Sequence, residues 1–214
     1  MSTLSGLYSY LPRSGSTLIT SLLNQRADVY MPFQSPLVEI LYRSNALWSD
    51  KDFEIEVSAS DIAKMRVAAV SGVCGGFCSA ITTKPIFIDK HWCWAWNSNM
   101  ELADEITPNI RVLRTWRDPS EIRKSFDKCG FDYSEDRLQE ILAAHSGAVE
   151  VDNYRVLSIN FEEIQDDILG VMSQIEAWFN LSEYDYDIEK PSVNSVITDR
   201  ILGSTTLHEL RGFA

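Results

Sequence analysis

"YSYLPRSGSTLITSLLNQ", residues 8–25, is the stretch that decides how this chain is expected to fold. A run of apolar and small residues ends at Pro12, and from Thr17 onward the apolar residues recur at helical spacing. The pattern predicts a strand, a tight turn and a helix. Gly15 would let the backbone approach a ligand closely, and the start of such a helix points free N–H groups and its positive dipole end at one spot.

The side chains of this turn favour an anion at that spot. An arginine offers a charge-assisted contact, and hydroxyl groups offer further donors. We therefore predict an anion-binding loop, with an ordinary capped helix start beside a surface arginine as the alternative. The loop consists of Arg13, Ser14, Gly15, Ser16 and Thr17.

Known phosphate loops and nucleophile motifs do not match this turn. It lacks the GxxxxGK[ST] pattern of nucleoside triphosphatases. The GxSxG elbow of hydrolases and the cysteine loop of phosphatases are absent from it as well. These three classes of enzyme are therefore disfavoured.

The rest of the chain alternates strand-like and helical patterns, which predicts an α/β fold with three layers, a mainly parallel sheet flanked by helices. At 214 residues with 45% apolar content, we expect a single domain over residues 1–214. Residues 43–84 are interpreted as variable loops. The expected strands are Leu4–Tyr10, Pro85–Asp89, Arg111–Trp116 and Arg155–Phe161, and the clearest helices are Pro119–Asp127, Ser134–Ala148 and Ile168–Leu181.

Charge and composition limit the partners. The net charge is −12, and its excess lies in residues 129–190, which hold 15 acidic and 3 basic residues. Nucleic acid is therefore an unfavourable partner. No run approaches the roughly 20 apolar residues of a membrane span. The first ten residues carry neither a basic region nor a long apolar run, and the four cysteines lack metal-ligand spacing, so we expect a cytoplasmic protein without a membrane anchor. The sequence gives no indication of the oligomeric state.

A second candidate site lies in "RVLRTWRDPSEIRKSF", residues 111–126. Asp118 as a cap and Pro119 at the first helical position predict the start of a helix. Arg117 precedes the cap, and Ser125 lies two turns along on the same side. Together they could hold a second anion, although a surface arginine and a helix serine would give the same pattern.

These motifs resemble those of the sulfotransferases that use 3′-phosphoadenosine 5′-phosphosulfate (PAPS). "LPRSGSTLI" is similar to that family's 5′-phosphosulfate loop, and Arg117 and Ser125 have the spacing of its 3′-phosphate site. "INFEEIQDDILGVMSQIEAWFNL" resembles the family's late strand, acidic turn and long helix. The resemblance covers roughly residues 4–181 and implies a nucleotide-kinase-like core that binds PAPS as donor.

The implied chemistry is in-line transfer of a sulfuryl group to an acceptor hydroxyl or amine, with no metal. Fixed cations would stabilise the leaving oxygen. Arg13 fits that role, and Lys90, in "KPIFIDKHWCW", matches the family's lysine near the reacting group. His91 is the candidate base, one residue out of the family's register. Several branches of the family carry a glutamate in the region of Gln34, which cannot accept a proton. Glu39 is the second candidate, because it lies on an expected helix after Pro36 from which its side chain could point inward.

Several questions stay open at this level. A phosphotransferase of the nucleotide-kinase type would need a loop lysine and a magnesium partner that the sequence does not show. A non-catalytic nucleotide-binding module is the third hypothesis. The acceptor is not indicated, and Trp92, Trp94 and Trp96 either wall an acceptor pocket or pack in the core.

Overall fold

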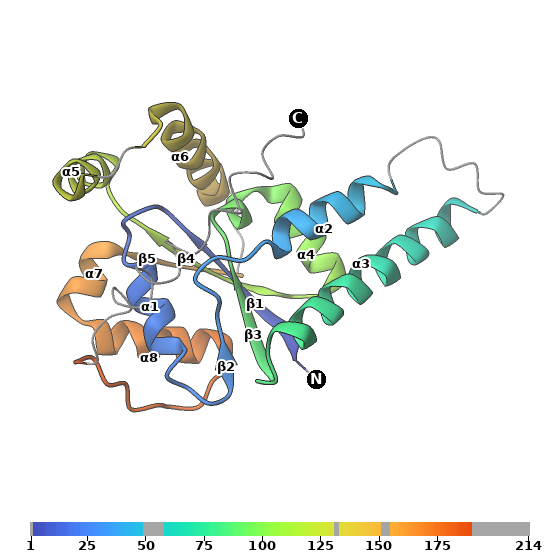
Figure 1. Ribbon diagram of the computed structural model, residues 1–214, viewed down its shortest axis with the longest axis horizontal. Helices are drawn as coiled ribbons and strands as arrows, with labels where there is room; N and C mark the ends of the chain where they lie inside the picture. The colour runs from blue at the N-terminus through green and yellow to red at the C-terminus, as the bar shows by residue number, and fades with distance from the viewer. Residues whose placement is uncertain (1, 49–57, 131–132, 151–154, 190–214) are drawn as a thin grey trace.

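The computed structural model describes residues 2–48, 58–130, 133–150 and 155–189 (Figure 1). Its centre is a parallel sheet of five strands in the order β2-β3-β1-β4-β5. This arrangement confirms the predicted α/β class with a parallel sheet. The strands are β1 (Thr3–Tyr10), β2 (Val29–Tyr30), β3 (Ile86–Lys90), β4 (Arg111–Trp116) and β5 (Val156–Asn160).

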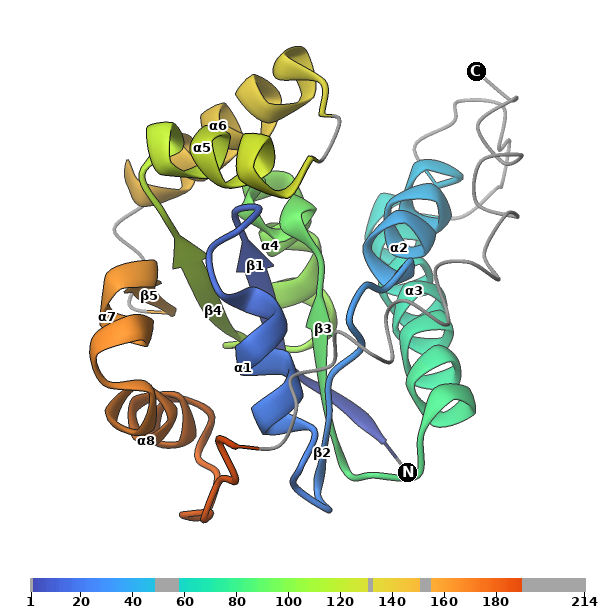
Figure 2. The same cartoon turned by 60° about the vertical axis from the view of Figure 1, so that its left-hand side comes forward.

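Helices cover both faces of the sheet and its carboxyl edge (Figures 1 and 2). One face is covered by α1, α7 and α8, and the other by α2, α3 and α4. Helices α5 and α6 lie beyond the carboxyl ends of the strands. The bounds are α1 (Ser16–Leu23), α2 (Leu37–Ala46), α3 (Ala59–Ile81), the 3-10 helix η1 (Trp92–Ala95), α4 (Asn97–Ile106), α5 (Pro119–Cys129), α6 (Glu135–Glu150), α7 (Phe161–Asp166) and α8 (Ile168–Phe179).

The expected elements are present, and one expectation was wrong. Every predicted strand and helix is found with its ends shifted by no more than two residues. Residues 43–84, interpreted as loops, instead contain the 23-residue helix α3. Within the described residues, no helix is long and apolar enough to cross a membrane.

Side-chain alternation along the strands divides the core in two. In β1, Leu7 packs in the cluster that includes α2, α3 and α4, and its neighbour Tyr8 packs in the cluster with α1, α7 and α8. Helix α8 approaches β1 so closely that a Cβ added to Gly6 would lie 2.3 Å from Cε1 of Phe179. Any larger residue at position 6 would therefore require the Phe179 ring to move.

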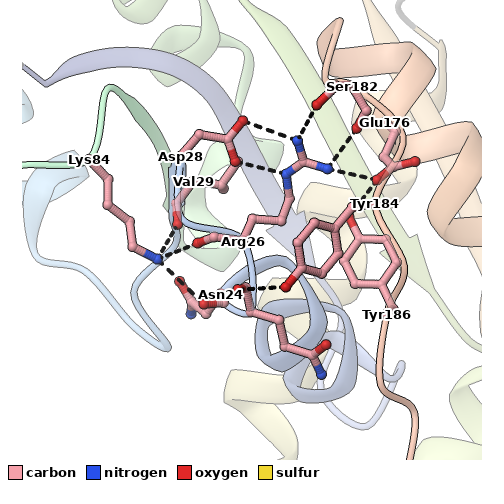
Figure 3. A network of polar contacts seen from close by, with 10 residues as sticks. Asn24, Arg26, Asp28, Val29, Lys84, Glu176, Ser182, Tyr184 and Tyr186 are labelled. Carbon is pink, nitrogen blue, oxygen red and sulfur yellow. Dashed lines mark hydrogen bonds and ion pairs between the residues drawn. The ribbon is translucent and has the colours of Figure 1, made fainter.

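A buried polar network ties the segment after α8 to the loop between α1 and β2 (Figure 3). The Arg26 side chain is 2% exposed, and its guanidinium pairs with Asp28 at 3.0 Å and with Glu176 of α8 at 2.8 Å. It also donates a 2.7 Å hydrogen bond to the carbonyl of Ser182, and the hydroxyl of Tyr186 donates to Glu176 at 2.9 Å. The guanidinium and the Glu176 carboxylate thus satisfy one another inside the protein, and the Asp28 side chain, which is 40% exposed, pairs with the same guanidinium at the surface.

The parallel register brings the strand ends to one edge. Tyr8 of β1 is paired with Lys90 of β3, and Tyr10 is paired with Thr115 of β4. In open parallel sheets, ligands bind beyond this carboxyl edge. The turns after β1, β3 and β4, which carry the predicted site residues, therefore lie next to one another.

Candidate active site

The turn between β1 and α1 is tightly coiled. Arg13 and Gly15 both adopt the left-handed region, with φ of 60° and 80°. This conformation is unusual for an arginine, and such strain is concentrated at ligand-binding loops. A Cβ added to Gly15 would also lie 3.0 Å from Cδ1 of Ile164. The glycine is therefore required both by its φ and by the close approach of α7.

One predicted contribution of this loop was wrong. Ser14 is fully buried, and its hydroxyl donates a 2.6 Å hydrogen bond to the carbonyl of Leu11 and lies 2.8 Å from Oγ1 of Thr115. Its side chain therefore ties the loop to β4 and does not face a ligand. Ser16 and Thr17 line the cavity described next.

A cavity of about 320 Å³ lies at the amino end of α1. It brings together the two anion sites that the sequence predicts, one from the loop after β1 and one from the start of α5. The first turn of α1 adds N–H groups that have no intrahelical partner. Its lining consists of Arg13, Gly15, Ser16, Thr17, Leu18, Arg117, Ser125 and Phe161.

Arg13 spans this cavity. Its Nε donates a 2.9 Å hydrogen bond to Oγ of Ser125, and its Nη2 lies 3.2 Å from Sγ of Cys129, the exposed cysteine at the end of α5. The cation of the first predicted site and the hydroxyl of the second are thus in direct contact. Cys129 was not singled out in the sequence, because nothing in its local pattern places the end of α5 beside the loop.

Arg117 is held in a fixed orientation on the other wall. Its Nη1 donates a 3.1 Å hydrogen bond to the carbonyl of Arg13, and its guanidinium lies 4.0 Å from the ring centroid of Phe161. Its Nε is buried and donates to no acceptor within the described residues. A buried N–H without an acceptor is costly, so this group favours an anion in the cavity. Sequence reasoning missed Phe161, whose only signal is its place at the start of α7, directly after β5.

Lys90 lies behind the cavity rather than on its wall. Its side chain is on the α1 face of the sheet, and its Nζ is 3.3 Å from the carbonyl oxygen of Ser16. The rings of Tyr10 and Phe33 lie 4.8 Å and 5.9 Å from that nitrogen. The residue is 2% exposed, and burial lowers the pKa of its amine to about 7. An anion placed nearby would favour the charged form.

The structure corrects the expectation for His91. Its backbone is extended, so its side chain points to the face opposite Lys90. Its Nδ1 accepts a 3.1 Å hydrogen bond from the backbone N–H of Cys93 and caps η1. Burial lowers the pKa of the imidazole to about 4. The ring is therefore neutral with its proton on Nε2, and its one lone pair is already used, so it is not placed to act as a base.

A second cavity, of about 480 Å³, opens on the other side of the β3 end. Trp92 and Trp96 line it, whereas Trp94 is 1% exposed in the core and donates a 2.7 Å hydrogen bond to Asp89. Two of the three tryptophans thus line a cavity, and the third packs in the core. The full lining is Val38, Glu39, Tyr42, Arg43, Trp92, Cys93, Trp96, Asn99 and Arg137.

Cys74, Cys78 and Cys93 are buried, as expected for packing residues. Among the residues that the structure describes, no group of three or more histidine, cysteine or acidic side chains is placed to hold a metal ion.

Several solved structures share this architecture. The sulfotransferase domain of the Synechococcus PCC 7002 olefin synthase aligns with a TM-score of 0.59 and 14% identity over 92% of this chain and 84% of that one. The chain has the sulfotransferase fold. The sulfotransferase domain from the curacin biosynthetic pathway gives a TM-score of 0.56 and 16% identity over 86% and 76% of the two chains.

A sulfotransferase from Alicyclobacillus acidocaldarius is similar as well, with a TM-score of 0.53 and 14% identity over 92% of this chain and 91% of that one. No protein-family model and no curated protein matches the sequence. At such low identity the similarity establishes the sulfotransferase fold alone.

Proposed function

We propose that the protein is a sulfotransferase that moves a sulfuryl group from PAPS to a hydroxyl or amine acceptor. The observation that carries the proposal is the convergence of Arg13, Arg117 and Ser125 on one cavity at the amino end of α1. The cavity offers cationic and hydroxyl donors from two sequence regions, which suits a ligand that carries two separate anionic groups.

Each end of the donor has its own partners in this proposal. The first turn of α1 and the Arg13 side chain would hold the 5′-phosphosulfate. The buried Nε of Arg117 and the hydroxyl of Ser125 would hold the 3′-phosphate. Binding would replace the contact between Arg13 and Ser125 with contacts to anionic oxygens, which are stronger for both groups.

In the transfer step, the acceptor oxygen or nitrogen forms a bond to sulfur while the bond from sulfur to the bridging oxygen breaks. Negative charge grows on that bridging oxygen. We propose that Lys90 stabilises this charge, because its buried amine lies 3.3 Å from the carbonyl oxygen of Ser16, the first residue of α1. Its low-dielectric surroundings, including the ring of Tyr10 at 4.8 Å, would strengthen the interaction.

The proton of the acceptor needs a different recipient from His91. Glu39 is the only carboxylate that lines the second cavity among the described residues, and it is exposed there. We propose Glu39 as the base on this ground. The occupied lone pair of His91 also supports a second candidate function, a protein that binds the nucleotide without transferring sulfate.

Two measurements test the proposal. Thermal unfolding with 3′-phosphoadenosine 5′-phosphate (PAP), compared with ATP and Mg²⁺, should give the larger shift of the melting temperature with PAP. A larger shift with ATP and Mg²⁺ would favour phosphotransfer. Incubation with sulfur-labelled PAPS and a library of hydroxyl and amine acceptors, in the presence of EDTA, should label at least one acceptor. PAP binding without labelling of any acceptor would favour the non-catalytic alternative.

A further inference from the structure

The lining of the second cavity, which includes Trp92, indicates the chemical class of ligand that would bind there. At about 480 Å³ it is in the size range of small-molecule sites. It lies between α2, η1, α4 and α6, on the face of the sheet opposite α1 (Figure 2). The cavity at the amino end of α1 and this one are therefore on two sides of the same strand ends.

Aromatic side chains form one wall. The rings of Trp92 and Trp96 meet edge to face with centroids 5.1 Å apart. Tyr42 of α2 is 60% exposed, and Trp96 is 36% exposed. Large aromatic surfaces left open around a cavity suit a flat, apolar ring.

Two arginine side chains also line the cavity. The Arg137 guanidinium lies 4.3 Å from the ring centroid of Trp92 and pairs with Glu140 through Nη1. Arg43 donates no side-chain hydrogen bond and forms no ion pair within the described residues. Against these two cations the lining holds one carboxylate, Glu39. Because Glu140 already pairs with Arg137, the unpaired cation of the lining within the described residues is Arg43, and an anionic ligand would gain its charge partner there.

Tyr10, at the end of β1, lies between the two halves of the core that border the cavities. Its ring lies 4.8 Å from Nζ of Lys90 and packs against both halves of the core. Burial and, to a lesser extent, Cys93, which lines the second cavity, raise the pKa of the Tyr10 hydroxyl to about 12. A ligand in the second cavity would thus be one aromatic ring away from the amine proposed to act on the donor.

We infer that this cavity holds the acceptor, and that the acceptor is a hydroxylated aromatic compound carrying a carboxylate. The carboxylate would lie against Arg137 and Arg43, and the ring against Trp92 and Trp96. The transfer rests on the proposed function: the hydroxyl oxygen forms the bond to sulfur, PAP leaves with the bridging oxygen, and the hydroxyl proton passes to Glu39. The inferred binding of the carboxylate by the two arginines does not depend on the transfer step.

The binding test uses 4-hydroxybenzoate and its uncharged isostere 4-hydroxybenzamide, titrated into the whole chain by calorimetry. The acid should bind at least about 10-fold more tightly, the scale for one interaction with a charged group. Arg137→Gln and Arg43→Gln should each remove most of this preference, and Glu39→Gln should increase it. Arg123→Gln is the matched control, because Arg123 pairs with Glu135 outside the cavity.

The inference is overturned if the amide binds as tightly as the acid, if neither binds, or if Arg137→Gln has no more effect than Arg123→Gln. Sulfur-labelled PAPS separates this failure from that of the proposed function. Transfer to 4-hydroxybenzamide and 4-hydroxybenzoate with equal kcat/KM would contradict the acidic acceptor while supporting sulfotransfer. Arginine-dependent binding of the acid without transfer would support the site and contradict sulfotransfer.

Discussion

Nε of Arg13 donates a 2.9 Å hydrogen bond to Oγ of Ser125, across 112 positions of sequence. The contact joins the loop that precedes α1 to the second turn of α5. The cation of one predicted anion position thus donates to the hydroxyl of the other. A ligand with two anionic groups would take over both side chains at once, whereas a ligand with one would leave part of the contact in place.

Arg117 is expected to distinguish such ligands. Its buried Nε has no acceptor among the described residues, so a 3′-phosphate would gain a desolvated partner there. Arg117→Gln should weaken PAP binding by roughly 30-fold, corresponding to about 2 kcal/mol, and should change adenosine 5′-phosphate binding much less. Calorimetric titration of both nucleotides checks this. Arg123→Gln, on the same helix start, is the control, and equal losses for both nucleotides would refute the assignment.

The amine of Lys90 should take up a proton when the donor site is filled. Burial lowers its pKa to about 7, so the amine is largely neutral at pH 8 before nucleotide is added, and a nearby anion raises the pKa again. Calorimetry of PAP binding at pH 8 in buffers of different ionisation enthalpy should show proton uptake. Lys90→Met should remove it, while Lys124→Met, at an exposed lysine, should not. Unchanged uptake in Lys90→Met would mean that another group titrates.

For His91 we expect a structural role. Its Nδ1 caps η1, and Asn can place an oxygen near the same position. His91→Ala should lower the free energy of unfolding by about 1 kcal/mol, and His91→Asn should restore part of that loss. Denaturant titration measures both. Once an acceptor is known, turnover of His91→Asn should stay within a few-fold of the parent protein, and a loss of about 100-fold would return the histidine to the role of base.

The network around Arg26 predicts a large effect on stability. Removing the guanidinium leaves Glu176, which is 5% exposed, as a buried carboxylate without its cation. Arg26→Met should lower the free energy of unfolding by about 3 to 5 kcal/mol. The double variant Arg26→Met with Glu176→Gln should recover part of the loss, because the unpaired charge is gone. A single-variant effect below about 1 kcal/mol would contradict the view of a buried, fully paired network.

The sequence predicted the sheet because its signals are local. Proline, glycine and the switch from a strand to a helical pattern mark the turn at residues 11–17 without any tertiary contact. Helix α3 was missed because its "VCGGFC" stretch is typical of a loop, and its stability comes from packing of Cys74 and Cys78 in the core. Tertiary burial there outweighs the low helix propensity of glycine.

The sequence indicated which residues come together at the cavity beside α1, but not how the side chains of Ser14 and His91 are oriented. Arg13, Arg117 and Ser125 converge because parallel strands end at one edge, a consequence of the topology. The hydroxyl of Ser14 turns inward because Thr115 of a neighbouring strand offers it a partner. His91 faces away from Lys90 because successive side chains of an extended chain alternate, so an offset of one residue changes the face.

The affinity of the unmodified protein for PAP relative to adenosine 5′-phosphate tests the central claim most directly. The two nucleotides differ only in the 3′-phosphate. In the proposed complex, Arg117 and Ser125 would both contact this group at the cavity beside α1. At about 1.5 kcal/mol or more for each bond to a charged group, calorimetry should find PAP at least about 100-fold tighter. Equal affinities, or no binding of PAP, would contradict a PAPS-dependent sulfotransferase.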